Sequence, residues 1–162
     1  MIIVGPKPSS VVDFNAEKFC AIVNFNDCPL NPLELSLSNK YFWCPIVEES
    51  NWGYIPFYFG WQVYQQFKNH GKPIYFHCFA GINRSPTLAW AILKAEFSGD
   101  VSKIKQNIIH NSRLPYFYER NIDRRYVPQD IDEFLLLCKT YPNCSLEELL
   151  IRLRAGQKDF LA

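Results

Sequence analysis

Residues 73–87 read PIYFHCFAGINRSPT. The β-branched and aromatic residues that open this stretch, at 73–76, predict a buried strand. The residues that close it and continue to position 97 predict a helix with Pro86 in its first turn. A short loop, residues 77–85, therefore joins the end of a strand to the start of a helix.

A loop in this position is suited to binding an anion. Backbone N–H groups at the start of a helix have no partner within the helix, and the helix dipole adds partial positive charge. A phosphate dianion fits such a nest of amides. The amides expected to bind phosphate belong to the residues of this loop: Phe79, Ala80, Gly81, Ile82, Asn83 and Arg84.

The side chains of the loop indicate phosphate-ester chemistry. Cys78 and Arg84 form a Cys-x5-Arg motif, in which the arginine can donate a fork of two N–H groups to two phosphate oxygens. The same positive field favours the nucleophilic thiolate of Cys78. Ser85 can donate a hydrogen bond to that sulfur, and Gly81 lets the backbone turn close to the ligand. The motif is weak alone, and the addition of His77, Gly81 and Ser85 makes it specific.

Residues 77–85 resemble the signature His-Cys-x-x-Gly-x-x-Arg-Ser/Thr of the cysteine-dependent protein tyrosine phosphatases. The Ala-Gly and Arg-Ser-Pro-Thr details are most similar to the dual-specificity branch. Residues 41–48 resemble the strand and loop that carry the general acid of the family, and residues 124–128 with 134–135 resemble its late Arg, Pro and helix pattern. The resemblance extends over residues 2–141, strongly at the loop and loosely elsewhere.

The resemblance implies a phosphatase that acts through a phosphocysteine intermediate. Cys78 would attack phosphorus in line, while Arg84 and the loop amides stabilise the equatorial oxygens. Ser85 would ease the departure of sulfur when water hydrolyses the intermediate, and His77 is expected to orient the loop rather than act as a base. The implied substrate is a phosphorylated protein or peptide, and the implied chemistry uses neither a metal ion nor an organic cofactor.

The general acid is where this chain departs from the family pattern. The family has an aspartate at this place, whereas this chain has Glu48 followed by Glu49. We expect Glu48 to protonate the leaving oxygen, with Glu49 as the alternative and Asp27 too far upstream. The extra methylene of Glu48 shifts its carboxyl by about 1.5 Å unless the loop compensates, and a misplacement of that size can cost about 10²-fold in rate. In a competing interpretation, both glutamates are solvated loop charges.

Two other functions stay open from the sequence. A related class of enzymes removes phosphate from RNA 5′ ends without an aspartate acid, so the missing aspartate favours it. The net charge of +1 and the Ser85-Pro86 pair argue against this function, in which nucleic acid would be the substrate. The other alternative is a non-catalytic module that binds a phosphorylated partner, and the intact Cys78, Arg84 and Ser85 argue against that.

Length and composition fit a single catalytic domain over residues 1–162. The chain is 48% hydrophobic and 20% charged, as globular domains are, and no stretch approaches the roughly 18 apolar residues of a membrane span. The start of the chain does not read as a signal peptide, so the six cysteines are expected to be reduced thiols. The lack of a Cys-x-x-Cys or clustered His pair predicts no metal site. These features favour a cytoplasmic protein without a membrane partner. His70 and His110 are expected to be exposed.

The expected fold is α/β, with a small, mostly parallel sheet of four or five strands flanked by helices, as in dual-specificity phosphatases. The loop would lie at the carboxyl end of the fourth strand, where open α/β sheets place ligands. Strands are expected at residues 2–4, 20–25, 41–44 and 73–77. Helices are expected at residues 56–70, 86–97, 101–110, 129–139 and 145–154, the last with a capping box of Ser145 and Glu148.

Overall fold

The computed structural model contains a parallel sheet of five strands, in the order β3-β2-β4-β1-β5. The structure describes residues 1–11, 13–28, 40–47, 50–81, 83–110 and 124–156. The strands are β1 (Ile2–Gly5), β2 (Ala21–Asn24), β3 (Tyr41–Trp43), β4 (Ile74–His77) and β5 (Ile108–His110). Because all five are parallel, their carboxyl ends meet at one edge of the sheet.

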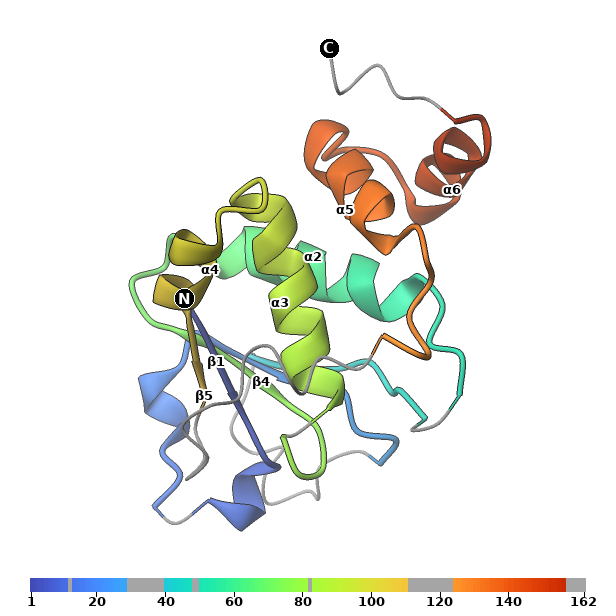
Figure 1. The fold of residues 1–162 in the computed structure, drawn as a ribbon. Coiled ribbons are helices and arrows are strands. Elements are labelled where there is room, and N and C mark those ends of the chain that lie inside the picture. The colour runs from blue at the N-terminus through green and yellow to red at the C-terminus, as the bar shows by residue number, and fades with distance from the viewer. Residues whose placement is uncertain (12, 29–39, 48–49, 82, 111–123, 157–162) are drawn as a thin grey trace.

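Helices cover one face of the sheet, and short turns cover the other. On the helical face, α2 and α3 pack against the strands, while α5 and α6 stack farther from the sheet (Figure 1). The helices are α2 (Ile55–Phe67), α3 (Arg84–Glu96), α4 (Val101–Asn107), α5 (Ile131–Thr140) and α6 (Leu146–Arg154). The 3-10 helices η1 (Pro8–Ser10) and η2 (Ala16–Lys18) belong to the segment between β1 and β2. None of the described helices combines the length and apolar character needed to cross a membrane.

Strand β4 is buried on both faces because it is the middle strand. Ile74 and Phe76 point into the core beneath the helices, and Tyr75 points to the opposite face. There the ring centroid of Tyr75 lies 5.0 Å from that of Phe19 and 5.2 Å from that of Phe14. A strand with this environment needs an apolar run without polar alternation, which is the pattern that identified it in the sequence.

The expected α/β fold is confirmed, with one error in its elements. The four predicted strands are present, α3 begins at Arg84 rather than at Pro86, and α6 has the predicted capping box. The helix predicted over 101–110 is wrong in its last part, because the chain leaves α4 after Asn107 and forms β5 beside β1. Without β5, strand β1 would expose an unpaired edge, and the β-branched Ile108 and Ile109 suit a strand better than a helix end.

Candidate active site

The structure brings the two ends of the predicted loop together at the carboxyl end of β4. Cys78 follows the strand directly, and Arg84 and Ser85 form the first turn of α3. All three are buried, with Cys78 exposed by 2% and Arg84 by 4%. The sulfur of Cys78 lies 3.4 Å from the hydroxyl oxygen of Ser85, so the predicted hydrogen bond between these side chains has a suitable distance.

The guanidinium of Arg84 is anchored on one side. Its Nη1 donates a hydrogen bond of 2.8 Å to the carbonyl oxygen of Ile46, on the segment that follows β3. The same nitrogen lies 3.8 Å from Oδ1 of Asp27, on the segment that follows β2. Its Nε is buried and has no hydrogen-bond partner among the described residues. A buried, unpaired donor is costly, and an anionic oxygen is the ligand that best satisfies it.

The helix start behind the loop leaves its own donors available. The residue before α3, Asn83, makes no side-chain capping bond, and its side-chain oxygen has no partner among the described residues. Most helices use such a side chain to satisfy N–H groups of the first turn. The positive end of the α3 dipole therefore faces the loop without a local side chain to compensate it.

Gly81 holds the loop against the end of β1. Its φ is +70°, and a Cβ atom at this position would lie 2.3 Å from the carbonyl carbon of Gly5. The backbone N–H of Lys7 also donates a 3.1 Å hydrogen bond to the carbonyl oxygen of Phe79. The ring of Phe79 is 55% exposed, and the Lys7 ammonium lies 4.4 Å from its centroid. Only glycine fits the contact with Gly5, as the loop pattern predicts.

His77 is fully buried at the end of β4, where its ring stacks on Tyr75 at 5.7 Å. Burial lowers the pKa of His77 to about 4, so the ring is neutral near pH 7. Its Nδ1 lies 3.4 Å from the carbonyl oxygen of Cys78, and because a carbonyl only accepts, Nδ1 carries the hydrogen. This geometry is compatible with a residue that orients the loop rather than one that exchanges protons.

His110 is less exposed than the sequence predicted. His70 is exposed as predicted, but His110 is half-buried at the end of β5. Its Nε2 lies 2.7 Å from the carbonyl oxygen of Gly81, within the loop between Cys78 and Arg84. Burial lowers the pKa of His110, which the bond to Gly81 partly opposes. The prediction failed because it treated 101–110 as one exposed helix, whereas β5 brings this side chain to the carboxyl edge of the sheet.

Asp27 also lies closer to the site than its place in the sequence indicated. Strand β2 is the neighbour of β4, so the segment after β2 emerges beside the loop. That segment is held by Asn24, whose Oδ1 accepts a 2.7 Å hydrogen bond from the N–H of Asn26 and whose Nδ2 donates to the hydroxyl of Tyr41 at 2.7 Å. A polar residue directly after a neighbouring parallel strand was the available signal.

Three predicted site residues lie outside the described residues: Ile82, Glu48 and Glu49. Their roles remain predictions. The chain before Glu48 is described as far as Val47, which is exposed, and Ile46 contacts Arg84 as noted above.

Solved structures share this fold, although no family model and no curated protein matches the sequence. One is the Cydia pomonella PTP-2 phosphatase, at 18% identity and a TM-score of 0.51 over 84% of each chain. PTPMT1 matches at 15% identity and a TM-score of 0.52 over 95% of each chain. PTPMT1 in complex with PI(5)P matches at 14% identity and a TM-score of 0.50, over 85% of this chain and 82% of that one.

This chain has the phosphatase fold. The resemblance stated from the signature is therefore confirmed at the level of the fold, with the Cys-x5-Arg loop at the carboxyl end of the middle strand.

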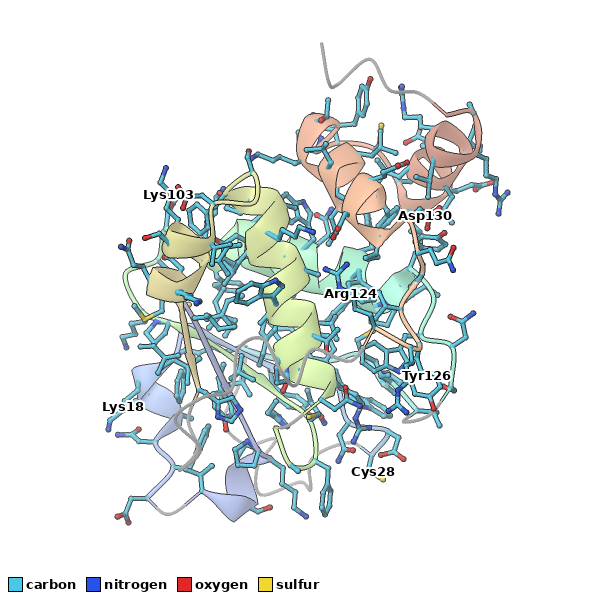
Figure 2. The ribbon with its side chains drawn as sticks, in the orientation of Figure 1. Lys18, Cys28, Lys103, Arg124, Tyr126 and Asp130 are labelled. Atoms are coloured by element: carbon cyan, nitrogen blue, oxygen red, sulfur yellow. The ribbon has the colours of Figure 1, made fainter. Side chains whose placement is uncertain are left out.

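In this phosphatase fold, residues 124–128, which carry the late Arg and Pro pattern, lie shortly before α5. Arg124, Tyr126 and Asp130 lie along the chain that leads into α5 (Figure 2). Arg124 pairs with Asp132 at 3.6 Å, and the carbonyl oxygen of Tyr126 accepts a 3.0 Å hydrogen bond from the N–H of Trp52. The bond from Trp52 ties the chain before α5 to the segment before α2.

The six cysteines are free thiols. Cys28 lies exposed at the periphery (Figure 2), whereas Cys44 is buried. Burial raises the pKa of Cys44 to about 11, so it stays protonated near neutral pH. Cys78 is also buried, and it lies at the start of the loop that leads into α3.

Proposed function

We propose that residues 1–162 form one catalytic domain, a cytoplasmic cysteine-dependent phosphatase of dual-specificity type. It hydrolyses phosphate monoesters on tyrosine, on serine and threonine, or on both, in phosphorylated proteins or peptides. The observation that carries this proposal is the arrangement of Cys78 and Arg84 at the start of α3. A buried thiol lies 3.4 Å from a serine hydroxyl, and a buried arginine keeps its Nε without a partner among the described residues.

In the first step, the Cys78 thiolate attacks phosphorus, and the P–S bond forms as the ester P–O bond breaks. Arg84 and the amides of the loop, including that of Ile82, stabilise the equatorial oxygens. The Ile46 carbonyl fixes one side of the guanidinium, so that its remaining N–H groups can be directed at phosphate. Positioning of this kind lowers the entropic cost of reaching the transition state.

In the second step, water attacks the phosphocysteine, and the S–P bond breaks. Ser85 donates its hydroxyl proton in a hydrogen bond to the leaving sulfur, across the 3.4 Å that separates these atoms. Inorganic phosphate is the product, and the thiolate is restored.

Glu48 is proposed to donate a proton to the leaving oxygen in the first step and to accept one from water in the second. It follows Ile46 by two positions, and two residues of chain span about 7 Å at most. The contact between Ile46 and Arg84 supports this assignment, because it brings the chain just before Glu48 to the guanidinium.

A parallel assay tests this proposal. The purified protein is incubated without added metal with p-nitrophenyl phosphate, a phosphotyrosine peptide, a phosphothreonine peptide and triphosphate-ended RNA. We expect hydrolysis of the aryl phosphate and of at least one peptide. Cys78→Ser should abolish turnover while keeping vanadate binding, and Cys28→Ser, which changes an exposed thiol, should match the wild type.

The other outcomes separate the alternatives. Selective hydrolysis of the RNA would favour the RNA 5′-phosphatase, which is the second candidate because no aspartate stands at position 48. Oxyanion binding without turnover on any substrate would favour the non-catalytic module. Residual hydrolysis by Cys78→Ser near a tenth of the wild-type rate would contradict a covalent mechanism.

A further inference from the structure

The phosphate loop is backed by the ends of the two strands β1 and β5. The N–H of Lys7 bonds to the carbonyl oxygen of Phe79, and the α-carbon of Gly81 rests on the Gly5–Pro6 backbone. The contact from β5 is the shortest, at 2.7 Å between Nε2 of His110 and the carbonyl oxygen of Gly81. It joins the edge strand of the sheet to the middle of the loop.

The direction of this hydrogen bond is set by its acceptor. A carbonyl oxygen has no hydrogen to give, so Nε2 of His110 donates. Nε2 carries a hydrogen in the neutral Nε2–H tautomer and also in the protonated ring. Either form of His110 can therefore donate this bond. Burial lowers the pKa of His110 and so favours the neutral ring.

The bond matters because of what the Gly81 carbonyl would do if it turned. Gly81 has a φ of +70° and lacks a side chain, so its peptide groups can rotate more freely than those of other residues. A nest binds an anion only while its N–H groups point inward and its carbonyl oxygens, which are partially negative, point elsewhere. The hydrogen bond from His110 holds the Gly81 carbonyl oxygen and opposes its rotation toward the anion.

The geometry points to His110 as a positioning residue of the phosphate loop, which holds the Gly81 carbonyl oxygen away from the bound phosphoryl group. This inference rests on the proposed function, because it assigns the loop an anionic ligand. The inference gives β5 a role in the chemistry of the site in addition to its pairing with β1.

The test compares variants at position 110 by their affinity for vanadate, by kcat and KM on p-nitrophenyl phosphate, and by thermal unfolding. His110→Leu fills the space without a donor. His110→Gln places an amide N–H at about the reach of imidazole Nε2 and restores a donor. His70→Leu is the matched control, since it removes an exposed histidine elsewhere.

We expect His110→Leu to bind vanadate roughly three- to tenfold more weakly and to raise KM by a similar factor, the change that the loss of one net hydrogen bond produces. His110→Gln should recover most of the affinity, and His70→Leu should equal the wild type. Reduced thermal stability with unchanged vanadate affinity in His110→Leu would overturn the inference, as would a His110→Gln variant as weak as His110→Leu.

The proposed function can fail separately. A wild-type protein that binds vanadate but hydrolyses none of the substrates leaves the affinity comparison valid and contradicts only the enzymatic proposal. A wild-type protein that binds no oxyanion contradicts both. Circular dichroism of each variant at the assay temperature shows that the compared proteins are folded.

Discussion

The Arg84 guanidinium, in the first turn of α3, lies 3.8 Å from the Asp27 carboxylate, on the segment that follows β2. The arginine is almost fully buried, while the Asp27 side chain is 52% exposed. A second contact, the 2.8 Å bond to Ile46, already fixes the guanidinium. If the proposed phosphate site is correct, Asp27 is a counter-charge that competes with the bound phosphate, rather than the group that positions Arg84.

Replacement of Asp27 by Asn should tighten oxyanion binding. The change removes a negative charge near the ligand while the bond from Arg84 to Ile46 remains, so vanadate should bind about two- to fivefold more tightly, within the range of an exposed ion pair. Titrations at low and at about 1 M salt should show the gain shrinking as charges are screened. Glu17→Gln changes net charge equally at an exposed site and should have no effect. Weaker binding by Asp27→Asn would show that Asp27 positions the arginine after all.

Substitution of Gly81 by Ala should damage both stability and activity. The added Cβ would meet the Gly5 backbone at 2.3 Å, and the positive φ adds strain. We expect a loss of about 2–3 kcal/mol in the free energy of unfolding, and a fall of about 10²-fold in kcat/KM because the loop shifts. Gly71→Ala is the matched control, since it shares a positive φ of 89° but has nothing within 4 Å of the new Cβ. Urea unfolding and steady-state kinetics on both variants separate the backbone strain of a positive φ from the steric clash with Gly5. Equal losses of stability and activity in Gly81→Ala and Gly71→Ala would refute the clash.

Glu48→Gln should discriminate between leaving groups. If Glu48 is the general acid, its loss should slow hydrolysis of phosphothreonine far more than that of p-nitrophenyl phosphate, because an alkoxide needs protonation more than a good aryl leaving group does. The basic limb of the pH–rate profile should flatten in the variant, while the acidic limb persists. Glu49→Gln provides the comparison. Small and equal losses on both substrates would remove Glu48 from the mechanism.

Stability should fall on mild acidification because of His77. Its pKa is about 4 in the folded protein, below the ordinary value of 6.5, so between these values the unfolded chain binds a proton that the native state does not. Stability from this residue is thus complete above pH 6.5 and decreases as pH falls toward 4, by on the order of 3 kcal/mol. Urea unfolding at several pH values should show a shallower decrease for His77→Phe than for the wild type. The same slope in both proteins would exclude His77 as its cause, and the exposed His70→Gln should keep the wild-type slope.

Local features of the sequence determined most of the loop and its surroundings. Strand, loop and helix start are adjacent in residues 73–87, and the orphan amides, the thiol and the arginine come from that adjacency. Periodicity likewise identified β1 to β4 and the helices α2 to α6 of the described residues, because burial on one or both faces leaves a pattern along the chain. Each of these properties depends on neighbours in sequence, so a single sequence carries them.

The tertiary structure alone decided which distant residues reach the loop. Asp27 and Ile46 meet Arg84 because β2 and β3 run parallel to β4, and His110 meets Gly81 because residues 108–110 pair with β1 instead of extending α4. The secondary-structure propensity of a short segment is weak compared with the hydrogen bonds that an open sheet edge offers. Pairing with β1 therefore determined that residues 108–110 form a strand. Strand order is a property of the whole chain, and the contacts around the loop between Cys78 and Arg84 follow from that order.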